Sequence, residues 1–301
     1  MDVFLTGATG YIGGAIVDAL LRAGHSVLSL ARSDKSAEVM RARSISPLRG
    51  DLRDSASLIR GAQQADAVIQ AGTTNSSDMD RVDIAAVEAI LTALEGTGKP
   101  FIYTSGCWVL GNTGDTIADE GAPTDPPAIV AWRSALERRV LSATTRGIRS
   151  VVIRPAVVYG RGGGIPATLI NLARQYGAAR YIGRGENHCP MVHVEDLADV
   201  YARALAKAPA GSLFNAPGGP ALRSKEIAQA VSQAAGLGGR TESWSLEAAR
   251  EMLGPLADAL ALDLQFSGDK AKRVLGWTPR ASSVIDDLVN GSYRSGIHSS
   301  L

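Results

Sequence analysis

The chain has 301 residues, and its 31 lysine and arginine residues are balanced by 30 aspartate and glutamate residues, which gives a net charge of +1. A balanced charge does not predict nucleic acid as a partner. Cys107 and Cys189 are far apart, so they predict neither a metal site nor a disulfide framework. No apolar run is long enough to cross a membrane, and a strand pattern begins at once. We therefore expect a cytoplasmic protein of one or two domains, with no signal peptide and no membrane contact.

The N-terminal stretch predicts a strand, a tight turn and the start of a helix. The apolar run 3–5 is typical of a buried strand, and Gly7, Gly10 and Gly13 follow it. A helical pattern then covers roughly 12–23. Such a turn points backbone N–H groups and the positive end of a helix dipole at an anion, usually a pyrophosphate. The stretch therefore predicts a bound dinucleotide.

The residues after the second predicted strand, 27–30, bear on which dinucleotide binds. An acidic residue at this place accepts hydrogen bonds from the ribose hydroxyls and favours NAD. The chain has Arg32 and Ser33 instead. Arginine pairs with a 2′-phosphate and stacks on adenine, and the serine adds a hydroxyl group. We interpret this pair as a preference for NADP over NAD; the alternative is that Arg32 is only a solvated surface charge.

Strands and helices alternate through the first half of the chain. Strand patterns at 45–48, 67–73 and 101–106 are separated by helical patterns at 55–60 and 83–94. This alternation predicts an α/β fold with a Rossmann-type, doubly wound parallel sheet.

The second half of the chain is less regular. We expect a loop over 112–127 and a flexible glycine turn over 161–164. The remaining expected elements are a helix at 129–145, strands at 150–155 and 157–160, helices at 166–177 and 195–207, a strand at 213–215, and helices at 224–235, 246–252 and 283–292.

Four motifs, at 6–13, 154–160, 192–198 and 275–279, carry a family resemblance. They read TGATGYIG, RPAVVYG, VHVEDLA and LGWTP. With them the chain resembles the extended short-chain dehydrogenase/reductase superfamily, in its NAD-dependent epimerase/dehydratase-like branch. The resemblance implies a smaller, interleaved C-terminal substrate domain. The nucleotide domain is then expected at 1–160 and about 191–215, and the substrate domain at about 161–190 and 216–301.

The same resemblance implies which residues hold the cofactor. Asp51 also follows a predicted strand, where its carboxylate could reach the adenine amino group, while Asp54 is a candidate N-cap. The residues implied are Thr6, Gly7, Thr9, Gly10, Tyr11, Ile12 and Gly13 around the pyrophosphate, Asp51 and Leu52 near adenine, Ala71, Gly72 and Thr73 along the cofactor, and Thr104, Pro155, Val157 and Val158 near the nicotinamide.

The family's catalytic signature is missing. Its chemistry uses a tyrosine and a lysine four residues apart on one helical face, where the lysine charge lowers the phenol pKa for proton exchange with a carbonyl or alcohol. Here Ala131 and Ala135 align with the tyrosine and lysine, and Gly106 aligns with the serine. The chain therefore resembles the atypical members of the superfamily, which lack the Ser-Tyr-Lys signature.

Other residues are candidates to replace the signature. Tyr159 could supply a phenol, Cys107 could face the nicotinamide, and His188 has a pKa suited to proton transfer; the alternatives are a packing tyrosine, a buried thiol and a solvated histidine. Trp132 and Arg133 lie on the helix that normally carries the signature. The catalytic candidates are Ser105, Cys107, Tyr159 and His188, and the candidates for the substrate pocket are Cys107, Trp132, Arg133 and His188.

Three functions fit these residues. The first is an NADP(H)-dependent oxidoreductase that reduces a carbonyl or activated double bond of a small molecule with non-standard catalytic residues, because positioning a hydride next to its acceptor supplies much of the rate. The alternatives are an epimerase or dehydratase acting on a sugar or small molecule, and a non-catalytic NADP-binding sensor. By analogy of fold, a homodimer could form through the helices near 83–95 and 129–145.

Overall fold

Seven parallel strands form the central sheet of the computed structural model, which describes residues 1–74 and 76–294. Their spatial order is β11-β6-β5-β4-β1-β2-β3, which confirms the predicted Rossmann-type, doubly wound fold. The strands are β1 (Asp2–Thr6), β2 (Ser26–Ala31), β3 (Ile45–Arg49), β4 (Ala67–Gln70), β5 (Pro100–Thr104), β6 (Arg149–Pro155) and β11 (Ser212–Ala216). β4 is buried at every position, as expected for a central strand with helices on both faces.

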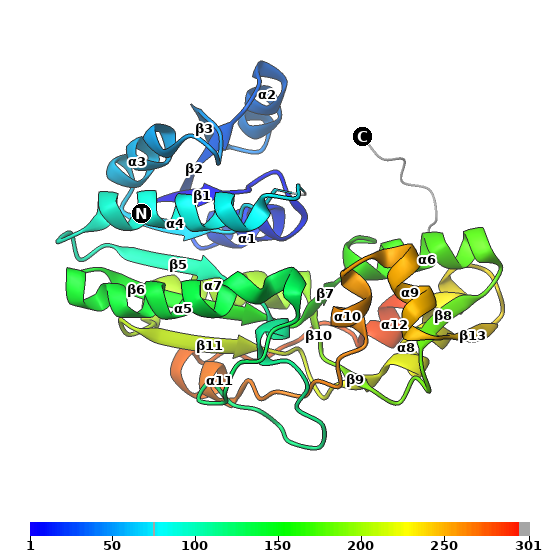
Figure 1. Ribbon diagram of the computed structural model, residues 1–301. Helices are drawn as coiled ribbons and strands as arrows, with labels where there is room; N and C mark the ends of the chain where they lie inside the picture. The colour runs from blue at the N-terminus through cyan, green and yellow to red at the C-terminus, as the bar shows by residue number, and fades with distance from the viewer. Residues whose placement is uncertain (75, 295–301) are drawn as a thin grey trace.

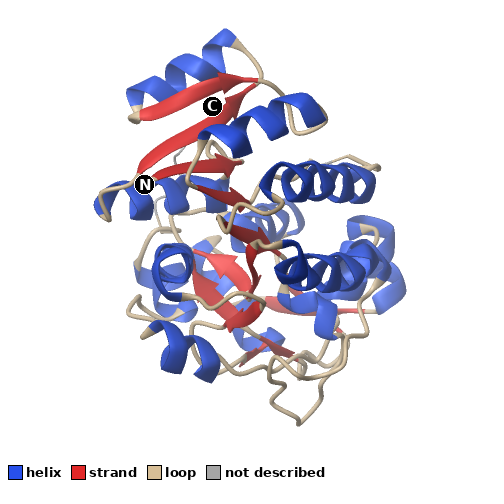
Figure 2. Ribbon diagram, turned by 90° about the vertical axis from the view of Figure 1, so that its left-hand side faces the viewer, coloured by secondary structure: helices blue, strands red, loops and turns tan. Residues whose placement is uncertain are grey.

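Helices cover both faces of the sheet, as Figure 2 shows. Apolar residues of α1, α2 and α7 pack on one face, and those of α3, α4 and α5 pack on the other. The helices are α1 (Tyr11–Arg22), α2 (Asp34–Ala42), α3 (Ser55–Gln64), α4 (Met79–Leu94), α5 (Ala131–Ser142) and α7 (Val194–Lys207). None of the helices in the described part of the chain combines the length and the apolar character needed to span a membrane.

A smaller C-terminal lobe lies beside the ends of the strands, at the right of Figure 1. Its two short parallel strands, β8 and β13, pair with each other. Two further strand pairs lie between the lobe and the sheet: β7 pairs with β10, and β9 pairs with β12. The elements are α6 (Gly164–Tyr176), α8 (Ser224–Ala234), α9 (Leu246–Leu253), α10 (Leu256–Leu260), α12 (Val284–Asn290), β7 (Val157–Tyr159), β8 (Ala179–Ile182), β9 (His188–Cys189), β10 (Met191–His193), β12 (Leu222–Arg223) and β13 (Thr241–Trp244). Helix α11 (Asp269–Leu275) instead packs beside the central sheet, against α7 and β11 (Figure 1). The last part of the predicted substrate domain, 295–301, lies outside the described residues.

Several boundaries differ from the sequence expectation. The strand predicted over 67–73 ends at Gln70, because Thr6 Oγ1 accepts hydrogen bonds from the backbone N–H groups of Ala71 and Gly72 and draws them away from the sheet. The strand predicted over 101–106 ends at Thr104, where the chain turns into a short 3₁₀ helix at Cys107–Leu110.

Other elements are longer, shorter or new. The glycine turn predicted over 161–164 already contains the first residue of α6, and the helix predicted over 129–145 is α5 with a short 3₁₀ turn at each end. Sequence analysis missed α2, although Ser33 caps it with a reciprocal hydrogen-bond pair to Ser36. It also missed β8 and β13, which are too short to carry a clear alternating pattern.

Candidate functional site

The glycine turn joins β1 to α1 in a very close backbone approach. Gly7 has a φ of +76°, and a Cβ added at Gly13 would lie 2.0 Å from the Gly7 carbonyl oxygen. Gly10 is the N-cap of α1, and among the described residues no side chain caps this helix. The first N–H groups of α1 therefore face outward at the positive end of the helix dipole, which is an anion-binding arrangement.

A cleft of about 830 Å³ opens over this turn, and we call it the outer cleft. It gathers most of the residues that the sequence assigned to the cofactor, from four different strand ends. Those predicted residues are Thr6, Gly7, Thr9, Gly10, Tyr11, Ile12, Gly13, Arg32, Asp51, Leu52, Ala71 and Thr73, and the cleft adds Ala8, Leu30, Arg53, Thr74 and Ser76. The cleft is thus built from the carboxyl ends of parallel strands, where ligands bind in such sheets.

Two arginines give the outer cleft positive charge. Arg32 is exposed at the end of β2, immediately before the N-terminus of α2. Arg53 also lines the cleft and is paired with Asp78 and Ser76. Sequence analysis did not identify Arg53, although its place two residues after Asp51 was an available signal.

Six predicted cofactor residues are not on the wall of the outer cleft. Three of them, Pro155, Val157 and Val158, line the second cavity described below, and the other three lie elsewhere. The Ser33 hydroxyl accepts the N–H of Ser36 at 3.1 Å and serves as the cap of α2. Gly72 packs against Thr6 and Gly7. Thr104 is occupied on both sides, because its Oγ1 accepts from the Tyr201 hydroxyl at 2.8 Å and its carbonyl accepts from an arginine at 2.8 Å.

A second cavity of about 280 Å³ adjoins the outer cleft, and we call it the inner cavity. The two share Tyr11 and Ile12 on their walls. The inner cavity brings together six sequence-predicted residues from separate segments. These are Ser105, Cys107, Arg133, Pro155, Val157 and Val158, together with Gly106, Trp108, Val130, Ala156, Gly164 and Ile165, which sequence analysis missed.

Tyr11 is fixed where the two cavities meet. Its hydroxyl donates to the Gly160 carbonyl at 2.8 Å, and a Cβ added at Gly163 would lie 2.6 Å from its ring. Burial is the main cause that raises the pKa of this phenol far above its ordinary value. Tyr11 is therefore a neutral wall residue between the cavities, and its hydroxyl proton is hydrogen-bonded to the Gly160 carbonyl.

Among the described residues, Arg133 is the one charged side chain on the wall of the inner cavity. Its Nη1 donates to the Thr104 carbonyl at 2.8 Å, and its guanidinium lies 5.3 Å from the centre of the Trp132 ring. Ser105, also on this wall, is buried, and its Oγ has no hydrogen-bond partner among the described residues. A fixed cation and an unpartnered hydroxyl therefore face the same small space.

The neighbouring thiol is not ionised at neutral pH. Cys107 is buried, and burial raises the pKa of its thiol far above the ordinary value. Cys107 therefore contributes a neutral, weakly polar surface to the inner cavity.

A family model described as the NAD dependent epimerase/dehydratase family matches residues 3–216. The chain belongs to this family. An uncharacterized protein of Schizosaccharomyces pombe is 34% identical to this chain, and the alignment covers 97% of this chain and 100% of the yeast protein. The 2-alkyl-3-oxoalkanoate reductase of Stenotrophomonas maltophilia is 26% identical, with 94% and 96% of the two chains covered.

Solved structures agree on the fold. The UDP-glucose 4-epimerase of Thermus thermophilus, in complex with NAD, superimposes with a TM-score of 0.80 at 21% identity, covering 99% of this chain and 100% of the epimerase. The dTDP-glucose 4,6-dehydratase DesIV of Streptomyces venezuelae gives a TM-score of 0.81 at 21% identity, with 98% of each chain covered. These likenesses show the same fold, and the family match confirms the predicted epimerase/dehydratase branch.

Helix α5 shows how this member of the epimerase/dehydratase family departs from the signature. Ala131 and Ala135, which align with the tyrosine and lysine, are exposed. The residues at this end of the helix that line the inner cavity are Val130 and Arg133. The cation that α5 presents to the inner cavity is thus an arginine, and no phenol accompanies it on α5.

Three further candidates lie away from the inner cavity, each for a visible reason. The Tyr159 hydroxyl donates to the Ser282 carbonyl at 2.6 Å. The His188 ring, in the C-terminal lobe, is paired with Asp263 through Nδ1 at 2.8 Å. The Trp132 indole N–H donates to Asp83 at 3.1 Å on the other side of α5. None of these three side chains is on the wall of the inner cavity formed by the described residues, although the Trp132 ring lies beside the Arg133 guanidinium.

The Gly7–Gly13 approach makes a direct prediction for stability. Gly13→Ala is expected to lower the free energy of unfolding by about 1–3 kcal/mol, because its methyl group overlaps the backbone of the turn. Chemical denaturation measures the change. Gly219→Ala is the control, since a Cβ there meets nothing within 4 Å; equal costs for the two variants would contradict the packing argument.

Proposed function

We propose that this member of the epimerase/dehydratase family is an NADP(H)-dependent oxidoreductase that reduces a carbonyl group or an activated double bond of a small molecule. The observation that carries the proposal is the junction of the two cavities at Tyr11 and Ile12. It joins an anion-binding turn to an inner cavity whose charged wall residue is Arg133. In this arrangement the turn would hold the pyrophosphate, and the inner cavity would take the nicotinamide and the substrate.

The turn fits a dinucleotide. At Gly7 and Gly13 an added Cβ would strike backbone atoms of the turn itself or of Gly72, so only glycine allows the tight turn that the dinucleotide fingerprint requires. When bound, the nicotinamide supplies or accepts a hydride. The protein's own contribution is to bind, to orient and to stabilise charge.

Two side chains have the chemistry to act on the substrate oxygen. The Ser105 hydroxyl can donate a hydrogen bond to a carbonyl oxygen, and its Oγ has no other partner among the described residues. Arg133 supplies positive charge where negative charge develops as a carbonyl is reduced. Because both groups are fixed before substrate arrives, they cost little reorganisation during the reaction. Solvent water supplies the proton that completes the alcohol.

Relatives support reduction as the chemistry. Besides the Stenotrophomonas reductase, a quinoline-1-oxide ketoreductase of Stigmatella aurantiaca is 23% identical, with 94% of this chain and 93% of its own covered. Both names describe the reduction of a ketone in a molecule with an apolar chain. We therefore place a ketone of a mainly apolar small molecule first among the substrates.

The preference for NADP predicts a specific mutational effect. Arg32→Ala is expected to weaken NADPH binding by about ten-fold or more, because a charge-assisted hydrogen bond to phosphate contributes about 1.5–3 kcal/mol. NADH binding should stay unchanged. Titration calorimetry with both dinucleotides measures this, and Arg41→Ala, in the last turn of α2, is the control. NADH binding as tightly as NADPH, with no loss in Arg32→Ala, would contradict the assignment.

A second candidate, a non-catalytic NADP-binding sensor, is favoured by alanine at positions 131 and 135. Purified protein mixed with NADPH and a panel of aldehydes, ketones and enones separates the two. Oxidation of NADPH with one of these compounds supports the reductase. Tight NADPH binding without oxidation by any of them supports the sensor.

The proposal extends to location and assembly. We place the protein in the cytoplasm, on its balanced charge and its composition, and we propose a homodimer through α4 and α5 by analogy of fold. Sedimentation of the purified chain tests the dimer.

A further inference from the structure

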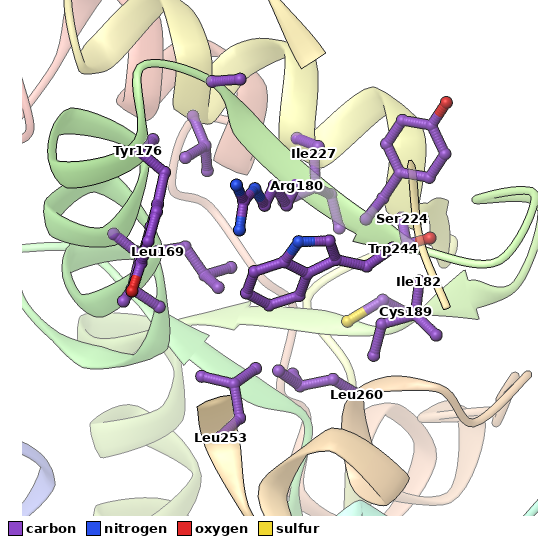
Figure 3. A pocket seen from close by; sticks show the side chains of 16 residues that line it. Leu169, Tyr176, Arg180, Ile182, Cys189, Ser224, Ile227, Trp244, Leu253 and Leu260 are labelled. Atoms are coloured by element: carbon purple, nitrogen blue, oxygen red, sulfur yellow. The ribbon is translucent and has the colours of Figure 1, made fainter. Parts of the chain in front are cut away.

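The C-terminal lobe contains a cavity of its own, about 80 Å³ in volume, which we call the lobe cavity. It lies among α6, α8, β8, β13 and the ends of α9 and α10 (Figure 3). Most of its 16 lining side chains are apolar, such as Leu169 and Leu260, and none of them lines the outer cleft or the inner cavity. The lobe cavity is therefore separate from the proposed reductase site.

Within the described part of the chain, Arg180 is the one charged residue on the wall of the lobe cavity. Its guanidinium carbon lies 4.4 Å from the centre of the Tyr176 ring and 4.6 Å from the centre of the Trp244 ring. Figure 3 shows the guanidinium between these two rings, among the apolar side chains. Contact with both rings holds the guanidinium in place, so its N–H groups are oriented before any ligand arrives.

The charge of Arg180 is only loosely compensated within the protein. Glu242 Oε2 lies 3.5 Å from Nε, and Nε has no hydrogen-bond partner among the described residues. Glu242 is also 3.6 Å from Arg240, and its side chain is 43% exposed. One half-exposed carboxylate is thus shared between two arginines, and Arg180 retains capacity for another anion.

The remaining polar groups on the wall do not compete for that anion. Burial raises the pKa of the Cys189 thiol to about 12, so the thiol is neutral at pH 7. The Ser224 hydroxyl already donates to Asn187. Tyr181 is another wall residue, and the ammonium group of Lys225 lies 5.7 Å from the centre of its ring. Lys225 therefore adds positive charge near the cavity.

We propose that the lobe cavity binds a small carboxylic acid with a short apolar body. The planar guanidinium matches the two oxygens of a carboxylate, and the apolar wall takes the hydrocarbon part. A cavity of about 150 Å³ holds benzene, so the volume of about 80 Å³ here favours a smaller body, such as a branched chain of a few carbons.

The proposal is tested by titrating the full chain with 3-methylbutanoate. Binding is measured by the change in tryptophan fluorescence and by calorimetry. The neutral comparison ligand is 3-methylbutan-1-ol. We expect saturable binding of the acid, weaker by about ten-fold or more in Arg180→Met, because the guanidinium–carboxylate hydrogen bonds are lost. Arg180→Lys keeps a charge and should bind at an intermediate level. Glu242→Gln, which removes the competing carboxylate, should bind more tightly than the unmodified chain.

Two matched variants localise the effect. Arg184→Met removes an exposed arginine just beyond β8, and Arg133→Met removes the arginine of the inner cavity; both should bind the acid as the unmodified chain does. Thermal unfolding of Arg180→Met verifies that it folds, and Arg180→Lys tests the charge if it does not. The proposal is overturned by absence of saturable binding, by equal affinity for acid and alcohol, or by equal losses in Arg180→Met and Arg184→Met.

Discussion

Arg133→Met is expected to lower kcat for carbonyl reduction by about 10²–10³-fold, the usual effect of removing one fixed group that stabilises transition-state charge. Methionine keeps much of the side-chain volume and removes the cation together with its hydrogen bond to the Thr104 carbonyl. Because Arg133 lines the inner cavity and not the outer cleft, NADPH affinity should stay close to that of the unmodified protein. Steady-state kinetics with a responsive ketone, together with NADPH titration, measure both effects.

Two further variants define the role of Arg133. Arg138→Met removes an exposed arginine of α5 and should leave kcat unchanged. Arg133→Lys keeps a charge but loses the planar fork, so we expect partial activity. If Arg133→Met keeps the kcat of the unmodified protein, Arg133 takes no part in the mechanism. If NADPH affinity falls in parallel with kcat, Arg133 acts in cofactor binding instead.

Glu137→Gln is expected to lower the free energy of unfolding by about 3–5 kcal/mol, because it leaves a buried guanidinium without its counter-charge. Arg154 donates two hydrogen bonds to Glu137, at 2.9 and 2.6 Å, and the two side chains are 4% and 3% exposed. Arg154 Nη1 already lacks a partner among the described residues. This pair ties α5 to β6, so its loss should also loosen the helix that carries Arg133.

The exposed ion pair between Glu88 and Arg139 is the natural comparison. It joins α4 to α5 with similar geometry, but its side chains are 41% and 49% exposed. Glu88→Gln should therefore cost about 1 kcal/mol or less. Chemical denaturation of both variants measures the difference, and equal costs would show that burial does not determine the strength of the Glu137 interaction.

The parts of the fold that depend on local pattern could be predicted from the sequence. The turn at Gly7, Gly10 and Gly13 has a fixed spacing, because the backbone must approach a helix and a phosphate closely. Buried parallel strands appear as short apolar runs between helices. Arg32 could be assigned to the outer cleft because it ends the second strand, a place that the topology itself determines.

The composition of the inner cavity could not be predicted in full. Its wall combines segments around residues 11, 105, 133, 157 and 164, and only tertiary packing decides which side of each segment faces inward. Tyr159 was a reasonable candidate by type, but β7 presents its neighbour Val158 to the cavity and turns the phenol toward Ser282. The sequence did not mark Arg180 as a binding residue. Its partners Tyr176 and Trp244 come from α6 and β13, which are far from each other in the sequence and meet only in the folded chain.

The central claim is that the outer cleft and the inner cavity form one site for hydride transfer. It is tested most directly with NADPH that carries deuterium at nicotinamide C4, incubated with the panel of aldehydes, ketones and enones. We expect one compound to be reduced with deuterium on the product carbon, and we expect Arg133→Met to form this labelled product about 10²–10³-fold more slowly. Tight NADPH binding without transfer of deuterium to any compound of the panel would contradict the claim.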